Sequence, residues 1–80
     1  MRTELNNEKA FNQIKVTRQS QGRTQKWLCE QSDVTVPTMR RYEKNTKQPD
    51  LNTLFKIAAA LNVPVCDLLV SENPYSNQSE

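Results

Sequence analysis

Apolar residues in this chain recur mostly at helical spacing, and no segment alternates apolar and polar residues as a half-buried strand does. The clearest stripe begins two residues after Pro49 and consists of Leu51, Leu54, Phe55, Ile57, Ala58 and Leu61. Because residues three and four apart share one face of a helix, the stripe predicts an amphipathic helix that buries this face. Asp50 is the predicted cap of this helix, Asn62 its end, and Pro64 prevents its continuation.

Two short helices are predicted on either side of the central part of the chain. The first begins at the cap Asn7, with Glu8 in its first turn, and ends at Gly22 in the left-handed conformation. Its inner face is supplied by Phe11 and Ile14. The other covers about residues 64–70, and its apolar side chains are Val65, Leu68 and Leu69.

Two more helices lie between these, separated by a very short turn. The second helix is predicted from Gln25 to about Ser32 behind the cap Thr24, with Leu28 facing inward. The third runs from residue 36 to about residue 44. Its predicted features are the cap Thr35, Pro37 in the first turn, and the inner positions Met39, Tyr42 and Glu43.

The 80 residues are expected to make one all-α domain at residues 7–70, with an N-terminal arm at 1–6 and a polar, mobile tail at 71–80. A chain of this length buries roughly 60% of its unfolded surface, which leaves little room for a deep substrate cleft. No apolar run is long enough to span a bilayer, and the N-terminus lacks the apolar stretch of a secretory signal. We therefore expect a cytoplasmic protein that does not contact the membrane.

Little in the sequence suggests metal or catalytic chemistry. The chain has no histidine, and its two cysteines, Cys29 and Cys66, are far apart in sequence, so no metal or cofactor is expected. Both cysteines are predicted to be small, reduced core residues. A glycine-rich phosphate loop and a clustered carboxylate pair are also missing, so we do not expect an enzyme.

The charge is unevenly distributed along the chain. Residues 15–47 carry eight basic and three acidic residues, whereas the rest carries three basic and six acidic ones. A polyanion is attracted to one side of such a molecule. From charge alone, a solvated surface with chance asymmetry is an equally good interpretation.

The stretch from Thr24 to Asn45 carries the strongest functional signal. Its two short helices are joined by a turn around Asp33 that is too short to let them run antiparallel. This arrangement is a helix-turn-helix, whose second helix enters the major groove of DNA. The outward positions of that helix are Val36, Pro37, Arg40, Arg41 and Lys44. Small apolar groups can touch a thymine methyl, and arginine forks can read guanine O6 and N7; the alternative is an ordinary solvated face.

With these segments, the chain resembles the Cro and phage-repressor (XRE-like) helix-turn-helix DNA-binding family over about two-thirds of its length. The matching residues are Ile14, Lys15, Arg18, Gly22, the TQKWL run at 24–28, Tyr42, Glu43, Pro49 and the LFKIAAALNV run at 54–63. The resemblance implies a compact, lambda-repressor-like five-helix domain, usually a homodimer, that binds short palindromic operators in double-stranded DNA.

The resemblance also implies residue roles. It places Val36, Pro37 and Arg41 at base-contacting positions, and Arg40 is a further candidate from its outward position, where it can serve either base or backbone. Gln25 matches a phosphate-clamping glutamine of the family. Further candidate phosphate contacts are Thr38, Lys44 and Lys47, and for the two lysines solubility is an alternative role. Arg18 and Glu43 match an internal ion pair that fixes the angle of the recognition helix.

The sequence also departs from the family. Asp33 and Asn45 stand where glycine is usual, and polar residues replace apolar ones at Thr17, Arg23 and Ser32. Trp27 is expected either to be half-buried against the first helix or the arm, or to contact DNA or a protein. The predicted function is a transcriptional regulator, expected to be a repressor. The alternative is an antitoxin or restriction–modification controller that acts partly through a protein partner.

Overall fold

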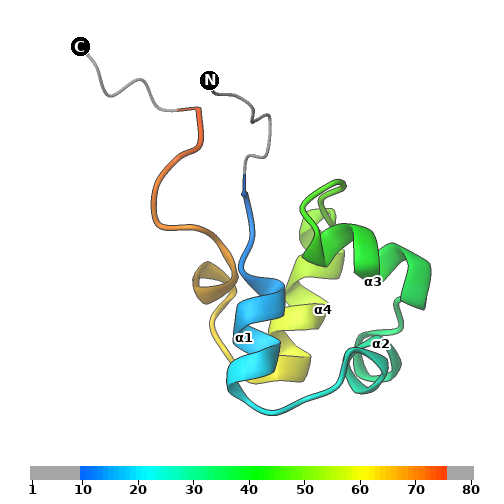
Figure 1. Cartoon of the computed structure of the whole chain (residues 1–80). Coiled ribbons are helices and arrows are strands. Elements are labelled where there is room, and N and C mark those ends of the chain that lie inside the picture. The colour runs from blue at the N-terminus through cyan, green and yellow to red at the C-terminus, as the bar shows by residue number, and fades with distance from the viewer. Residues whose placement is uncertain (1–9, 76–80) are drawn as a thin grey trace.

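The computed structural model describes residues 10–75, and these form four α-helices and a 3₁₀ turn (Figure 1). The elements are α1 (Ile14–Ser20), α2 (Gln25–Ser32), α3 (Val36–Glu43), α4 (Leu51–Leu61) and the 3₁₀ turn η1 (Val65–Leu68). No strand occurs in the described part of the chain, where an isolated antiparallel bridge joins Asn12 to Leu69. The all-α, helix-turn-helix fold predicted from the sequence is confirmed.

Side-chain caps begin two of the described helices, α2 and α4. Thr24 Oγ1 accepts a hydrogen bond from Trp27 N at 3.0 Å, and Asp50 Oδ1 accepts one from Thr53 N at 2.8 Å. The bond from Thr53 lowers the pKa of the Asp50 carboxyl, because a donated N–H stabilises the carboxylate. Thr35 occupies the N-cap of α3, but its side chain makes no capping bond. Its hydroxyl instead donates to Thr38 Oγ1 at 2.9 Å.

Each connection between helices contains a residue with left-handed backbone. Gly22, Asp33, Asn45 and Asn62 have φ values of 70°, 58°, 61° and 57°. Aspartate and asparagine tolerate this conformation better than other side chains do, so three of the four turns form without glycine. The turn between α2 and α3 is closed by Val34 N, which donates to Cys29 O at 3.1 Å.

The core joins all five elements. α2 packs on α4, α4 on η1, and α1 on both α3 and η1. The buried apolar residues are Ile14, Leu28, Cys29, Met39, Tyr42, Leu54, Ile57, Ala58, Leu61 and Leu68. Ser32 is also buried, and its hydroxyl donates to Leu28 O at 2.6 Å, which explains why a polar residue is tolerated there. None of the helices within residues 10–75 has the length and apolarity to cross a bilayer.

The prediction for the first helix is wrong within the described residues, because α1 begins at Ile14 and leaves Phe11 outside the helix. Before Ile14, the Asn12 side chain and a distant backbone carbonyl take the hydrogen bonds that a longer helix would need. Its Oδ1 accepts from Ile14 N, and the next amide, Gln13 N, donates to Leu68 O at 2.7 Å. Phe11 packs against Tyr75, with ring centroids 5.5 Å apart. The predicted cap Asn7, Glu8, the arm at 1–6 and the last part of the tail lie outside the described residues.

Three further expectations are corrected at the C-terminal side. Leu51 and Phe55 are 72% and 56% exposed, because α2 and η1 cover only part of the broad apolar stripe on α4. The predicted helix at 64–70 is the shorter turn η1, followed by Leu69, which is 44% exposed. Cys66 is exposed rather than in the core.

Cys29 is buried, as predicted. Burial raises the pKa of its thiol, and the negative charge of Glu43 raises it further.

Candidate nucleic-acid interface

α3 has a buried side and a side that faces outward, and each carries both apolar and polar residues. Met39, Tyr42 and Glu43 are buried, whereas Pro37, Arg40 and Arg41 are exposed and Val36 is half-buried. The inward positions agree with the helical spacing from which they were predicted. The outward face therefore presents two small apolar side chains near the start of the helix and two guanidinium groups one turn later.

A buried ion pair holds α3 to α1. Arg18 Nε lies 2.8 Å from Glu43 Oε2, and a second guanidinium nitrogen of Arg18 donates to Glu43 Oε1 at 3.1 Å. The third nitrogen donates to Arg23 O at 2.7 Å, so the whole guanidinium group is hydrogen-bonded. Breaking one partner of such a pair leaves an uncompensated buried charge, which makes the contact a rigid connection between the two helices.

Gln25 extends this polar group from the first residue of α2. Its Nε2 donates to Glu43 Oε1 at 3.1 Å. The side chain is therefore oriented at the N-terminus of α2, where free N–H groups favour an anion. Gln25, Arg18 and Glu43 connect α1, α2 and α3 through one carboxylate.

Cations surround a small hollow above the ion pair. The hollow has a volume of about 260 Å³ and is lined by Lys15, Arg18, Gln25, Arg40, Glu43 and Lys44. Arg40 therefore lines the same hollow as two candidate phosphate contacts, Gln25 and Lys44. Arg41 does not line this hollow. Lys15 also lines the hollow, although the sequence did not predict it as a DNA contact. Its position on α1, one turn before Arg18, is the feature from which this role could have been predicted.

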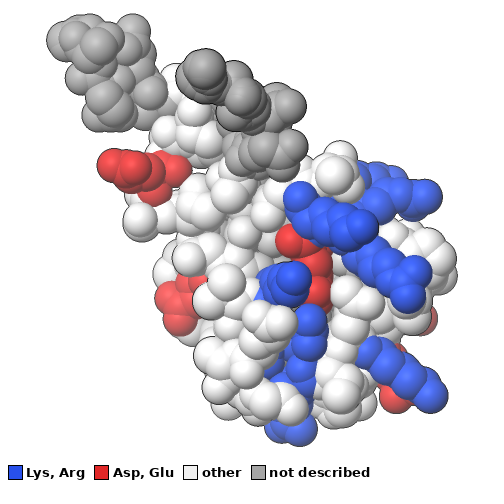
Figure 2. Space-filling view, in the orientation of Figure 1, with Lys and Arg blue, Asp and Glu red and all other residues white. Residues whose placement is uncertain are grey.

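The remaining candidate residues lie on α3 or directly after it. Thr38 is half-buried and engaged with Thr35, whereas Lys44 and Lys47 are exposed at the end of α3 and in the loop beyond it. Thr46 N and Lys47 N both contact Arg41 O, at 3.0 and 3.4 Å. Figure 2 shows Lys and Arg side chains gathered over α3 and beside it, with acidic side chains at the opposite edge of this view and also among and beside the cations.

Trp27 is half-buried and packs against the core. The guanidinium carbon of Arg23 lies 4.2 Å from the centroid of its ring. A cation over an indole face gains electrostatic stabilisation, which explains the polar residue at position 23. The arrangement agrees with the prediction of a half-buried tryptophan.

Known proteins match the part of the chain that contains these helices. The helix-turn-helix family matches residues 14–68, from the start of α1 to the end of η1. A crystal structure of "a putative DNA-binding protein from Bacteroides fragilis" is 38% identical to the chain, with a TM-score of 0.71, and the match covers 75% of this chain and 97% of that one. No curated protein matches the chain. The chain therefore belongs to the helix-turn-helix family of the Cro and phage-repressor (XRE-like) type.

Proposed function

We propose that this chain is a sequence-specific, DNA-binding transcriptional regulator, with repression as its expected effect. It reads a short palindromic operator in the major groove through α3. The observation that carries the proposal is the exposed face of α3, where Val36 and Pro37 are followed by Arg40 and Arg41. Family membership and the likeness to the "putative DNA-binding protein from Bacteroides fragilis" support it.

The roles of the side chains follow from their chemistry. Val36 and Pro37 contact thymine methyl groups, and Arg41 reads a guanine edge with its two-pronged guanidinium group. Gln25, Thr38, Lys44 and Lys47 contact phosphates, which position the protein without reading sequence. Arg18 and Glu43 contact each other rather than DNA and hold α3 at its angle.

Selection from random duplexes, followed by affinity measurements over a series of salt concentrations, tests this function. We expect one palindromic sequence to be enriched, and the logarithm of its affinity to fall linearly with the logarithm of salt concentration, with a slope of about −0.9 per phosphate contact. Failure to enrich any sequence over random DNA contradicts the proposal.

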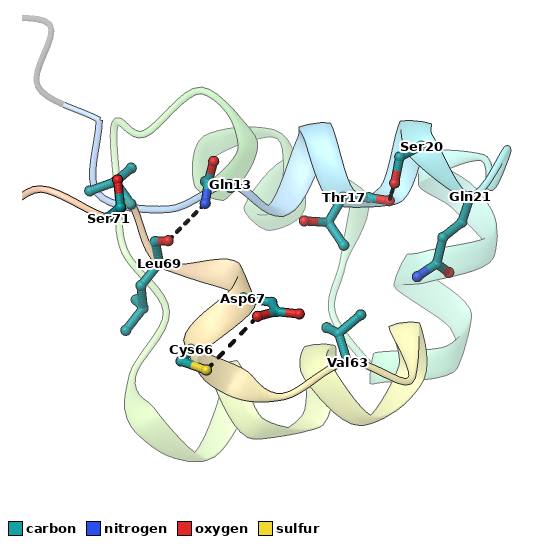
Figure 3. A pocket seen from close by; sticks show the side chains of 10 residues that line it. Gln13, Thr17, Ser20, Gln21, Val63, Cys66, Asp67, Leu69 and Ser71 are labelled. Carbon is teal, nitrogen blue, oxygen red and sulfur yellow. Dashed lines mark hydrogen bonds between the residues drawn. The ribbon is translucent and has the colours of Figure 1, made fainter.

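We further propose that the regulator binds as a homodimer to half-sites about one helical turn, roughly 34 Å, apart. One helix-turn-helix buries too little surface for tight specific binding on its own. The proposed contact is made by the segment after η1, where Leu69 is 44% exposed and Val70 is half-buried. A groove of about 750 Å³ lies beside it, between α1 and η1, lined in part by Thr17, Val63 and Leu69 (Figure 3).

Sedimentation of the wild type and of Leu69→Glu tests the dimer. We expect the substitution to shift the protein toward monomer, because it places a charge in the apolar contact. Leu51→Glu is the matched control, since Leu51 is 72% exposed on another part of the molecule. A wild type that stays monomeric at all concentrations, with and without DNA, contradicts the proposed dimer.

A further inference from the structure

Asn45, the residue in left-handed conformation after α3 and Lys44, uses its side chain to hold the N-terminal segment. Its Oδ1 accepts hydrogen bonds from Phe11 N at 2.8 Å and from Asn12 N at 3.0 Å. Its Nδ2 donates to Asn12 O at 3.3 Å. One amide therefore engages three backbone groups that are 33 or 34 residues distant in sequence.

Asn12 makes the reverse connection. It is buried, and its Nδ2 donates to Tyr42 O at 2.9 Å in the last turn of α3 and to Gln48 Oε1 at 2.8 Å in the loop beyond. Its Oδ1 accepts from Ile14 N at 3.1 Å, which fixes its orientation. The two asparagines thus form a reciprocal link between the N-terminal segment and the end of the recognition helix.

The N-terminal segment is itself anchored to the other end of the chain. Gln13 N donates to Leu68 O at 2.7 Å, and Val70 N donates to Phe11 O at 3.2 Å. The Gln13 side chain adds a bond to Leu69 O at 2.8 Å. The end of α3 is therefore tied to the backbone around η1, which lies next to the proposed dimer contact.

The backbone conformation alone does not account for this asparagine. Asn62 ends α4 with nearly the same φ, 57° against 61°, yet its side chain makes no hydrogen bond to the described residues. Glycine, the residue that such a conformation favours, would satisfy the turn at either position. The side chain of Asn45 thus has a role beyond that of the turn.

We propose that Asn45 is a positioning residue for DNA recognition. Together with Asn12 it fixes the C-terminal end of α3 and the following loop against the anchored terminal segment. Arg41, on the last turn of α3, is thereby held in place before DNA arrives. This inference rests on the proposed function, because positioning matters only if α3 reads base edges.

The first test compares Asn45→Gly with the matched control Asn62→Gly in the full chain. Both keep a backbone that glycine favours, and neither changes charge. We expect Asn45→Gly to lower affinity for the selected operator about tenfold, which lies within the range of one guanine contact. Affinity for a random duplex at the same salt concentration should change less than about twofold, because Lys44 and Lys47 keep their charges and non-specific attraction does not need them in one fixed position. Asn62→Gly should leave both affinities unchanged.

Amide hydrogen exchange adds a measurement that does not depend on DNA. In Asn45→Gly, the amides of Phe11 and Asn12 should exchange at least about tenfold faster than in the wild type, because they lose their acceptor. Asn45→Asp keeps an oxygen that accepts from both amides, but it replaces the Nδ2 donor to Asn12 O with a second acceptor, so we expect it to restore the protection only in part.

The outcomes separate the two proposals. A wild type that does not distinguish its selected sequence from random DNA overturns the proposed function and this inference with it. A wild type that does distinguish them, with Asn45→Gly keeping the same ratio, overturns only the positioning role. Unchanged protection of the Phe11 and Asn12 amides in Asn45→Gly also overturns it, because then the hydrogen bonds to Asn45 do not hold this segment.

Discussion

α3 and α4 bury one face in the same core, yet they differ in what holds them and in what they expose. α4 is held by apolar contacts through Leu54, Ile57 and Leu61 and by a hydrogen bond from Gln21 Nε2 to Leu61 O at 2.8 Å. It leaves Leu51 and Phe55 facing outward. α3 also buries apolar residues, but Glu43 adds a directional ion pair. Apolar packing is non-directional, whereas a hydrogen-bonded ion pair fixes both distance and angle. The helix with the proposed reading role is therefore the one that a buried ion pair orients.

Arg18→Ala removes the directional contact that distinguishes α3, and we expect the largest effect from it. The substitution leaves Glu43 buried without its cation, so the free energy of unfolding should fall by roughly 3–5 kcal/mol. Urea and thermal unfolding measure it. Lys56→Ala removes an exposed charge from α4 and should change stability by no more than about 0.5 kcal/mol. An unchanged midpoint in Arg18→Ala would show that the ion pair does not stabilise the fold.

Met39→Ala and Phe55→Ala compare the inner face of α3 with the outer face of α4. Met39 is 0% exposed, so its truncation should leave a cavity and cost about 2–5 kcal/mol. Phe55 is 56% exposed, so its truncation should cost about 0.5 kcal/mol or less. Urea unfolding of the two variants measures both. Equal losses would mean that Phe55 is covered in solution.

Local sequence signals predicted the helix boundaries that depend on neighbouring residues. Thr24 and Asp50 accept bonds from amides three residues ahead, and Asp33 and Asn62 adopt the backbone that their side chains tolerate. Spacing also located the inner face of α3, because few apolar residues compete on that short helix.

Contacts between distant residues could not be predicted in this way. The first helix starts late because Asn12 bonds to Tyr42 and Asn45, and nothing near residue 12 encodes those partners. On α4 the periodicity gives a broad stripe but not which neighbours cover it, so it places Leu51 and Phe55 in the core although both are exposed. The ion pair of Arg18 and Glu43 was reached only through family resemblance.

Arg41→Ala and Arg40→Ala sharpen the comparison within α3. Arg41→Ala should lose about 1–3 kcal/mol of discrimination between operator and random DNA, as expected for one bidentate base contact. Arg40 lines the hollow with Lys15 and Gln25, so we expect Arg40→Ala to weaken binding to both duplexes alike. Affinities for both duplexes at several salt concentrations measure the difference. If Arg41→Ala weakens both equally, recognition rests on Val36, Pro37, Arg40 or DNA shape.

Lys44→Ala and Lys47→Ala test the proposed phosphate contacts at the end of α3, and Lys56→Ala on α4 is their control. Each should weaken binding to all sequences and reduce the salt slope by about one unit, because one phosphate contact is lost. Lys56→Ala, on α4, should leave the slope unchanged. A slope that falls equally in all three variants would indicate a general charge effect rather than contacts at the end of α3.

The smallest expected effect concerns pH, because α4 has an ionisable cap and α3 does not. The bond from Thr53 lowers the pKa of Asp50, so its stabilising contribution is present above the ordinary carboxyl pKa and is lost as pH falls through the folded-state pKa. In Asp50→Asn the amide side chain still caps the helix but does not titrate. The difference in unfolding free energy between wild type and Asp50→Asn should therefore shift against the wild type as pH falls from about 6 to about 2. Taking the difference between the two proteins cancels the titration of the other carboxylates, which both share. A difference in unfolding free energy that stays constant over this pH range would contradict a charged cap on α4.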